Sequence, residues 1–493
     1  MTVGQAPPIE SQQSAVVDRP HRFGRGVLRL AVLVTGVALV INAVAVGVPR
    51  PWRDEAATHM ANQRTLPQLW SMLDHIDAVH GCYYLIVRLW QHPFGDSILS
   101  LRMLSVLAVA VGAGLLTLLA AELFGAAAAP WSGLSYALLP QLTWAAGEAR
   151  SYALSAALVT AAMLAFWLAT RRQRYYWWIC YLALATAAVY VFVYSALAFA
   201  GVGLALIWLP PRTRRAAALA TLGAAALSVP VVVRVAGQGA QVSWLEEYHY
   251  GAEQLVADAF WGQVGWAAWL GVGLSVLALG YAGWLLRQRP LRGPIVCVLG
   301  WLLVPSVVLG TAGSFVAIYH PRYVTFSVPA LALVLGLASS RLPGRRKLIA
   351  GLLLLLACVP ALVESRGPQA KPTVAAAVAV LAEQGRPGDG LYVVRYDRHA
   401  LPWSFPETVD ALDDVGADTG PGWRAETLKQ PSVPVRRIGA RLTSVNRVWV
   451  FADKGIRLEQ TERAFARLGF RPTWTTTVEQ GYLVTLVLME RTG

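Results

Sequence analysis

The chain has 493 residues, of which 56% are hydrophobic and only 14% are charged. A soluble domain of this length rarely carries so few charges, so the composition indicates a polytopic membrane protein. The formal net charge of +14 does not indicate nucleic-acid binding, because the arginines cluster between hydrophobic runs, as in the cytoplasmic loops of membrane proteins. The four cysteines show neither metal-ligand spacing nor a disulfide framework.

Residues 1–26 are polar or basic and are predicted to be a disordered cytoplasmic tail. Residues 27–363 are predicted to be a transmembrane domain, mainly α-helical. A membrane helix needs roughly 20 apolar residues, and this length gives about eleven spans. They are expected at 27–48, 98–124, 130–146, 152–170, 177–194, 196–209, 216–235, 260–286, 295–315, 323–339 and 348–363.

The arginine clusters predict the orientation of these spans. They lie at 171–174, 212–215, 287–292 and 341–347, always on the side that strict alternation makes cytoplasmic. The intervening loops on the other side hold the Asp, Glu, His and Trp residues. We therefore expect a cytoplasmic N-terminus, a C-terminus outside, and a plasma-membrane protein with its polar loops on the extracytoplasmic face.

The first outer loop, residues 49–97, is the part of the membrane domain richest in groups that transfer protons. Asp54 and Glu55 follow the end of the first span. An acidic pair at a helix C-terminus would oppose the helix dipole, which favours a functional role over a stabilising one. A solvated helix end is the alternative. Residues 83–91 are too short to span and are expected to lie in the membrane interface.

Further along this loop, Asp74, His75, Asp77 and His80 lie close together in sequence. This density of Asp and His is compatible with a divalent metal site, with contacts to sugar hydroxyls, or with simple solvation.

Two later outer turns carry further candidate site residues. Glu148, Arg150 and Tyr152 occupy the first turn, where an ion pair between Glu148 and Arg150 is the alternative to a functional role. His320, Arg322 and Tyr323 occupy the second. An arginine on the outer side runs against the usual charge bias of membrane proteins, and a guanidinium can hold a phosphate through two parallel hydrogen bonds.

From residue 364 the composition becomes mixed polar and apolar, which predicts a small soluble α/β domain over 364–493 on the outer face. Helices are expected at 374–384 and 458–468, and strands at 391–396, 448–451 and 482–489. The segment contains no glycine-rich phosphate loop and no catalytic triad.

Several of these motifs occur together in one known family. WRDEAAT after the first span, the DxxHGCYY segment, EARSYAL and HPRY resemble the GT-C membrane glycosyltransferases. The most similar branch is that of the protein O-mannosyltransferases and the lipid A aminoarabinose transferase. The resemblance covers roughly residues 25–346, and the C-terminal segment is similar to the variable outer domain of many bacterial members.

The resemblance implies an inverting transfer of a sugar from a polyprenyl-phosphate donor. Asp54 matches the acidic residue of this family that acts as general base on the acceptor hydroxyl, and Glu55 would assist by positioning. Arg322, with Arg150 and Tyr323, would hold the donor phosphate. Asp77, His80, Glu148, Tyr152 and His320 are expected to contact the acceptor or the sugar. No cofactor is expected, with a divalent metal as the open alternative.

The expected partners are the polyprenyl-phosphate sugar, the lipid bilayer, and a glycolipid, glycan or protein acceptor, with no nucleic acid. Mannose is the expected sugar and arabinose the alternative. A lipid or sugar transporter is the alternative from another class, but transporters place ionisable residues near the bilayer midplane. A scaffold that presents the C-terminal domain would leave the acidic first loop unexplained.

Overall fold

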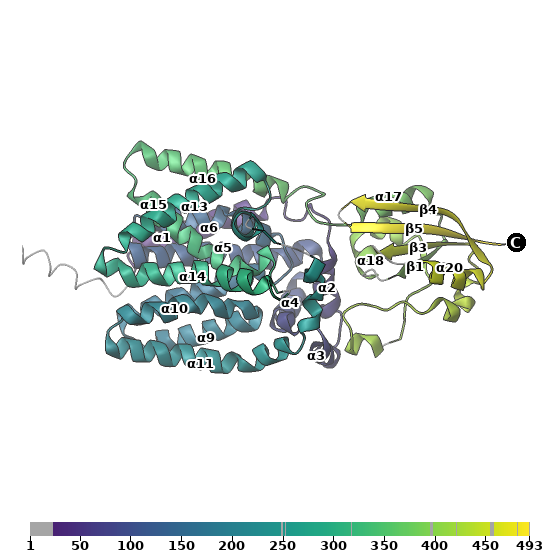
Figure 1. The fold of residues 1–493 in the computed structure, drawn as a ribbon, viewed down its shortest axis with the longest axis horizontal. Helices are drawn as coiled ribbons and strands as arrows, with labels where there is room; N and C mark the ends of the chain where they lie inside the picture. Colours follow the sequence, from purple (N-terminus) through teal and green to yellow (C-terminus); the bar gives the residue numbers. More distant parts are fainter. Residues whose placement is uncertain are drawn as a thin grey trace, which may run out of the picture.

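A computed structural model describes residues 23–247, 250–251, 253–316, 318–394, 398–420, 422–453, 458–480 and 482–492. The predicted tail at 1–26 therefore lies almost entirely outside the described residues. The protein has two parts, a bundle of long helices and a C-terminal domain built on a β-sheet (Figure 1). Helices of the first outer loop lie where the two parts meet.

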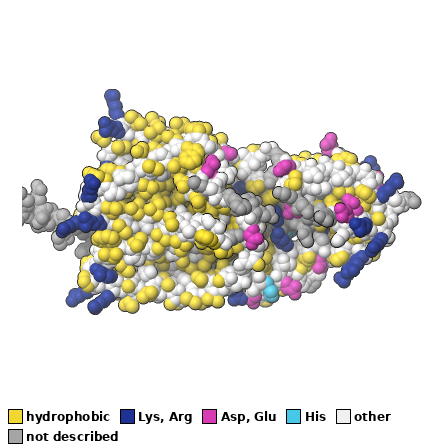
Figure 2. All heavy atoms as spheres, in the orientation of Figure 1, with side chains coloured by type: hydrophobic (Ala, Val, Ile, Leu, Met, Phe, Trp, Pro, Cys, Tyr) yellow, Lys and Arg dark blue, Asp and Glu magenta, His cyan; other side chains and the backbone are white. Residues whose placement is uncertain are grey.

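Among the described residues, eight helices are long and apolar enough to cross a membrane. They form the predicted multi-pass bundle, whose apolar side chains cover its flank in Figure 2. These helices are α1 (Arg25–Ala43), α5 (Ile98–Phe124), α8 (Tyr152–Arg172), α11 (Pro211–Ala236), α13 (Gly265–Leu285), α14 (Arg289–Gly313), the stretch Pro321–Arg341 that combines η8 (Pro321–Ser327) with α15 (Val328–Arg341), and α16 (Arg345–Glu364).

The other three predicted spans are helical but shorter or interrupted. The span expected at 130–146 breaks at Leu139, because a residue that precedes a proline, here Pro140, disfavours the α conformation. The stretch 193–208 alternates between two helical forms. The segments concerned are α6 (Ala129–Leu138), α7 (Pro140–Ala146), α9 (Tyr175–Val191), η4 (Val193–Phe199), α10 (Ala200–Ala205) and η5 (Leu206–Trp208).

The first outer loop folds into three helices at the end of the bundle that faces the C-terminal domain (Figure 1). They are α2 (Arg53–Asn62), α3 (Leu66–His75) and α4 (Gly81–Phe94), with the short turn η3 (Ala78–His80) between the last two. Their apolar faces share one small core, which includes Met72 and Tyr83. Thr65 and Gln68 form a reciprocal cap that fixes the start of α3.

Three further short helical segments lie between α11 and α13 and complete the same end of the bundle. They are η6 (Gly239–Glu247), η7 (Gln254–Asp258) and α12 (Ala259–Trp261).

The C-terminal domain has a five-stranded sheet with strand order β2-β1-β3-β5-β4. β1 pairs in parallel with β2 and β3, and β5 pairs antiparallel with β3 and β4. The strands are β1 (Gly390–Val394), β2 (Asp413–Asp414), β3 (Arg447–Asp453), β4 (Phe470–Gln480) and β5 (Tyr482–Arg491). The helical elements are α17 (Ala375–Gln384), α18 (Ala400–Ser404), α19 (Pro406–Val409), η9 (Gly422–Ala425), η10 (Val435–Arg437), η11 (Gly439–Leu442) and α20 (Glu459–Ala466).

Most elements predicted for this domain are present. The helices at 374–384 and 458–468 correspond to α17 and α20, and the strands at 448–451 and 482–489 to β3 and β5. β1 ends at Val394, and residues 395–397 lie outside the described part. β4 is an additional strand whose threonine-rich sequence contains Pro472, a residue tolerated in strands mainly at sheet edges.

Side chains of the first outer loop bind the C-terminal domain to the bundle. The buried Arg64 donates hydrogen bonds to the carbonyl oxygens of Arg424 at 2.9 Å and Thr427 at 2.8 Å. His59 stacks on Trp403 with ring centroids 4.6 Å apart. The two parts therefore pack through specific contacts on α2 and on the turn that follows it.

Candidate active site

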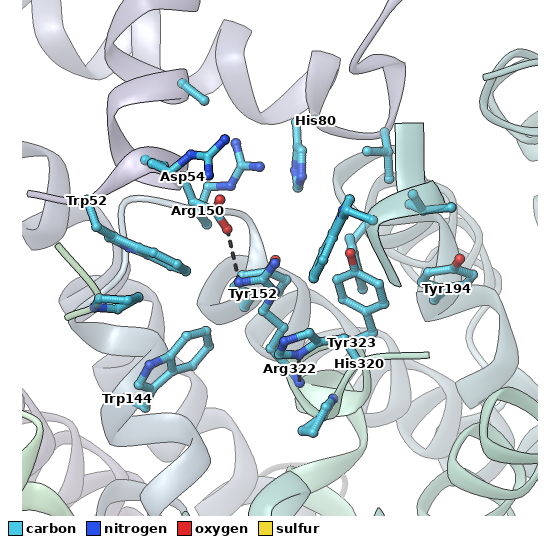
Figure 3. A pocket seen from close by; sticks show the side chains of 18 of the residues that line it. Trp52, Asp54, His80, Trp144, Arg150, Tyr152, Tyr194, His320, Arg322 and Tyr323 are labelled. Atoms are coloured by element: carbon cyan, nitrogen blue, oxygen red, sulfur yellow. Dashed lines mark hydrogen bonds and ion pairs between the residues drawn. The ribbon is translucent and has the colours of Figure 1, made fainter. Parts of the chain in front are cut away.

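A cavity of about 2290 Å³ opens where the helix bundle, the first outer loop and the C-terminal domain meet. Eight of the ten predicted site residues line it, although they come from four separate stretches of sequence. Figure 3 shows most of them pointing toward one another. They are Asp54, Asp77, His80, Arg150, Tyr152, His320, Arg322 and Tyr323.

Asp54 lies in the first turn of α2, after Trp52, which adopts an extended conformation as the N-cap. The sequence argument placed Asp54 at the C-terminus of a helix, and this is wrong because α1 ends at Ala43 and a new helix begins at Arg53. At a helix N-terminus the dipole stabilises a carboxylate. The Asp54 side chain is 24% exposed, and its Oδ2 atom lies 3.0 Å from Nη1 of Arg322.

The electrostatic surroundings of Asp54 keep it ionised. Burial raises the pKa of a carboxyl group, but the charges of Arg322 and then Arg150 outweigh burial and hold the pKa of Asp54 below its usual value. An ionised, partly accessible carboxylate can accept a proton from a hydroxyl group positioned beside it.

Arg150 and Arg322 form the cationic side of the cavity. Arg150 lies in the turn before α8 and donates through Nη1 to the hydroxyl oxygen of Tyr84 at 3.1 Å. In each arginine the Nε–H group is buried and has no hydrogen-bond partner among the described residues. Buried donors of this kind are costly unless they are paired, so the two guanidinium groups form a site suited to an anion such as phosphate.

Aromatic rings fix the position of Arg322. Its Cζ atom lies 5.6 Å from the ring centroid of Trp52, 5.5 Å from Trp244 and 5.8 Å from Tyr323. Rings at these distances attract a guanidinium group through their quadrupoles. The arginine is thus held in the cavity wall and keeps hydrogen-bond donors free for a ligand.

Asp77 and His80 line the cavity near the aromatic residues, and the His80 ring lies 6.4 Å from the ring of Phe192. Asp77 has left-handed backbone angles, φ 65° and ψ 22°, and its carboxylate accepts hydrogen bonds from Tyr84 and Gln241. His80 lies 3.2 Å, through Nδ1, from the hydroxyl oxygen of Ser151. Burial, reinforced by Arg150, lowers the pKa of His80 to about 3, so this imidazole is neutral at physiological pH.

Tyr152, His320 and Tyr323 form much of the aromatic wall, together with Phe192 and Tyr194. The rings of Tyr152 and Phe192 are 5.6 Å apart, and those of Tyr194 and Tyr323 are 5.7 Å apart. Burial and the neighbouring Arg322 lower the pKa of His320 to about 3. His320 is therefore also neutral, and its Nδ1 atom accepts the backbone N–H of Arg322 at 3.3 Å.

The structure places Glu55 outside the cavity. Its side chain is fully buried and forms a bidentate ion pair with Arg102, at 2.8 Å and 2.7 Å. A backbone N–H group, from Ala149, donates to the same carboxylate at 3.1 Å. Glu55 was expected to assist the reaction by positioning. Its contacts tie α2 to α5 and to the turn before α8, so such a role would be exerted from outside the cavity, and it stays a prediction.

Glu148 is likewise directed away from the cavity and is fully buried. It does not pair with Arg150. Instead its Oε2 atom accepts the indole N–H of Trp52 at 2.8 Å, and Oε1 is bonded to the ammonium group of Lys371. The predicted contact of Glu148 with the sugar or acceptor is therefore replaced by contacts within the protein.

Sequence reasoning missed several residues of this region. Trp52 directly precedes the RDE motif, and this position could have suggested its role. Tyr84 lies in the DxxHGCYY motif, which could have suggested its role. Phe192 and Tyr194 carry no sequence signal that distinguishes them from the many other aromatic residues. Lys371 lies beyond the predicted membrane domain, in a segment that was not expected to reach the site.

The described residues contain no group of three or more His, Cys, Asp or Glu side chains arranged to hold a metal ion. Asp74 is paired with Arg234 at the surface, and His75 contacts the carbonyl oxygen of Ser71 at 2.8 Å. Inside the cavity, Asp54 faces Arg322 and Asp77 is bonded to Tyr84 and Gln241. The carboxylates of the described site thus have protein partners of their own.

One side of the cavity is apolar. Val232 and Val235 of α11, Leu197 of η4 and Leu309 of α14 line it beside the polar residues. A cavity that combines cationic groups with an apolar side suits an amphipathic ligand, with an anionic head and a hydrocarbon chain.

The same fold occurs in solved membrane glycosyltransferase structures. ArnT from Cupriavidus metallidurans bound to undecaprenyl phosphate matches with a TM-score of 0.57 and 15% identity, over 92% of this chain and 97% of ArnT. The apo oligosaccharyltransferase of Archaeoglobus fulgidus matches with a TM-score of 0.54 and 12% identity, over 89% of this chain and 71% of that chain. The archaeal oligosaccharyltransferase AglB from the same organism, in complex with an inhibitory peptide and a dolichol-phosphate, has a TM-score of 0.51.

These neighbours belong to the GT-C superfamily, so the fold predicted from the motifs is confirmed. The protein has a multi-pass GT-C membrane fold with a small C-terminal sheet domain. No protein-family model and no curated protein sequence matches the chain.

Proposed function

We propose that this protein is an inverting membrane glycosyltransferase that transfers a sugar, mannose, from a polyprenyl-phosphate donor. The acceptor would be a glycolipid, glycan or protein of the cell envelope at the outer face of the membrane. One observation carries the proposal: Asp54, Arg322 and Arg150 share a cavity that has an apolar side, and both arginines keep a buried Nε–H group that has no partner among the described residues. ArnT, with the same fold, was solved with undecaprenyl phosphate bound.

In the proposed reaction, Asp54 accepts the proton of an acceptor hydroxyl group. The hydroxyl oxygen attacks the anomeric carbon of the donor sugar at the same time. The bond between that carbon and the phosphate oxygen breaks, and the configuration inverts. Arg322 and Arg150 stabilise the charge that grows on the departing polyprenyl phosphate. The apolar side of the cavity would accommodate the start of the polyprenyl chain.

Two features support this proposal against a transporter. The ionisable residues of the cavity lie in outer turns and at helix ends, on α2 and beside α8 and η8. Transporters more often place such groups near the bilayer midplane on broken helices. In addition, Asp54, Arg150 and Arg322 line one cavity, as expected where a base and a phosphate-binding site act on the same pair of substrates.

The choice of mannose rests on the resemblance of the sequence motifs to protein O-mannosyltransferases. We further propose that the transfer needs no divalent metal, because a departing monophosphate develops less charge than a nucleotide diphosphate and two arginines can balance it. An archaeal oligosaccharyltransferase of similar fold was solved as a complex with Zn and sulfate, so the proposal has to be tested directly.

The test is transfer of radiolabelled mannose from a polyprenyl-phosphate donor in membranes that contain the wild type or Asp54→Asn. The amide is nearly isosteric but cannot accept the proton, so we expect a loss of about 10²- to 10⁴-fold. Asp74→Asn, which changes a surface aspartate outside the cavity, is the matched control and should remain active. Equal product from wild type and Asp54→Asn would refute the role of Asp54.

The same assay tests the choice of sugar and the independence of metal. If wild-type membranes label no acceptor from the mannose donor but do label one from polyprenyl-phosphate arabinose, the proposed sugar is wrong. The proposed class of reaction, glycosyl transfer from a polyprenyl phosphate, is then retained. If neither donor is used, the proposed activity is wrong. Loss of transfer in EDTA that Mg²⁺ or Mn²⁺ restores would refute metal independence.

A further inference from the structure

The segment that joins α16 to the C-terminal domain forms part of the cavity wall. Residues 367–370 of this linker line the cavity, together with Ser365 and Pro372. Lys371 lies in the same segment but points into the protein, where it is buried. A lysine is rarely buried unless its charge is paired, so the partners of Lys371 indicate what the linker does here.

The ammonium group of Lys371 is held by groups of the membrane domain. It donates to the carbonyl oxygen of Gly147 at 2.9 Å and is bonded to the carboxylate of Glu148. The rings of Trp52 and Trp144 lie nearby, with centroids 5.9 Å and 5.8 Å from Nζ. Every one of these partners belongs to the membrane domain or to its first outer loop.

Glu148 connects this buried lysine to the catalytic cavity. Its second oxygen accepts the indole N–H of Trp52 at 2.8 Å. The Trp52 ring in turn lies 5.6 Å from the guanidinium carbon of Arg322, which pairs with Asp54 at 3.0 Å. Trp52 also occupies the N-cap position of the helix whose first turn contains Asp54. A chain of direct contacts therefore runs from the linker to both groups that act in the proposed reaction.

We propose that Lys371 is a positioning residue, through which the linker of the C-terminal domain holds Glu148 and Trp52 and thereby fixes Arg322 and Asp54 for transfer. This inference rests on the proposed function. It makes the C-terminal domain part of the active-site architecture, because the segment that joins α16 to α17 contains Lys371, whose bonding partners belong to the membrane domain.

The charge of Lys371 is sensitive to pH in the physiological range. Burial lowers the pKa of Lys371 to about 7, against the attraction of the Glu55 carboxylate. Arg102 also lowers the pKa of Lys371 and Asp54 raises it, while Glu148 is in direct contact with the ammonium group. As pH rises through about 7, Lys371 loses its proton and Glu148 remains as a buried carboxylate without its cation.

The experiment compares purified full-length wild type with Lys371→Met and Lys371→Arg, using initial rates over a range of donor concentrations and of pH. Binding of undecaprenyl phosphate to the same samples provides a second readout. Lys347→Met is the matched control, since it also removes one lysine, but in the first turn of α16, at the opposite end of this helix from the linker.

We expect Lys371→Met to lower kcat by about 10- to 100-fold, because small displacements of catalytic groups have effects of this size. Binding of undecaprenyl phosphate should weaken as Arg322 loses its support. The wild type should lose activity as pH rises through about 7. Lys371→Arg should keep activity to higher pH, because a guanidinium group stays protonated, and Lys347→Met should behave as the wild type.

Two results would overturn the inference while the proposed function stands. One is an active wild type with a folded Lys371→Met variant of unchanged kcat, KM and undecaprenyl phosphate binding. The other is a loss of activity at alkaline pH that occurs at the same pH in the wild type and in Lys371→Arg. This comparison remains decisive even if Lys371→Met does not fold. A wild type that neither transfers sugar nor binds undecaprenyl phosphate would refute the proposed function, and the inference with it.

Discussion

At the scale of single residues, Arg322 lowers the pKa of Asp54 in addition to its proposed role in holding the donor phosphate. Burial alone would raise the pKa of Asp54, and Arg322 is the strongest of the charges that lower it. A carboxylate acts as a base only above its pKa. In Arg322→Gln the pKa of Asp54 should rise, so the acidic limb of kcat/KM should move to higher pH.

This prediction is checked by pH–rate profiles of the wild type and Arg322→Gln. We also expect the rate to fall by about 10²- to 10³-fold at the optimum, as when one charge-stabilising donor is removed. Arg234→Gln is the control, because Arg234 pairs with Asp74 outside the cavity. An acidic limb that stays in place in Arg322→Gln would show that Arg322 does not control the ionisation of Asp54.

Sequence could single out Arg322 because an arginine on the outer side is contrary to the usual charge bias of membrane proteins, and Asp54 and Arg150 because they lie in the motifs WRDEAAT and EARSYAL. It could not separate Asp54 from Glu55. The two are adjacent on one helix and therefore point in different directions, and only the position of Arg102 decides which carboxylate is enclosed. For the same reason the ion partner of Glu148 could not be predicted, since Lys371 is 223 residues away.

At the scale of helices, α6 and α15 approach closely because Gly336 has no side chain. A Cβ atom at this position would lie 2.7 Å from Cα of Ser132 on α6, which is a backbone contact and cannot be relieved by a rotamer change. Gly336→Ala should therefore destabilise the bundle by about 1–3 kcal/mol. The measurement is thermal unfolding of the purified protein in detergent.

Gly280 on α13 is the matched control for this substitution. An added Cβ atom there would meet no atom within 4 Å, and alanine favours a helix interior over glycine. We expect Gly280→Ala to leave the unfolding temperature unchanged or to raise it slightly. A Gly336→Ala protein as stable as the wild type would mean that α6 and α15 are not packed as closely as the structure has them.

The lengths of the hydrophobic runs in the sequence predicted which segments are helical but not where each helix ends. The long runs give the eight extended helices directly, whereas the interruption at Leu139 and the mixed helical stretch at 193–208 depend on local backbone geometry. The start of α2 was the most consequential error, because it inverted the argument about the helix dipole at Asp54. β4 was missed since its threonines and Pro472 lack the apolar alternation of a half-buried strand.

At the scale of the whole molecule, the cavity exists only because three parts of the chain meet. The bundle supplies Arg322, the first outer loop supplies Asp54, and the linker to the C-terminal domain supplies residues 367–370. Sequence predicted the two domains and their order along the chain. It could not predict that the C-terminal domain docks on the first outer loop through Arg64, because such contacts join residues with no shared pattern in sequence.

The arrangement of charge over the whole molecule leads to a prediction of its orientation. In Figure 2, Lys and Arg side chains gather at the end of the bundle farthest from the C-terminal domain. That end carries the arginine-rich turn between α8 and α9. Cytoplasmic loops are enriched in basic residues, so we expect this end to face the cytoplasm, with the cavity and the C-terminal domain on the opposite side of the membrane.

Cysteine labelling of intact cells with a membrane-impermeant maleimide tests this orientation. Thr475→Cys, on an exposed position of β4, should react, and Arg174→Cys, in the exposed turn after α8, should react only after the membrane is permeabilised. Of the native cysteines, Cys297 and Cys358 are buried, and labelling of the unsubstituted protein gives the background. The reverse pattern would place the cavity in the cytoplasm, where a donor and an acceptor on the outer face could not reach Asp54.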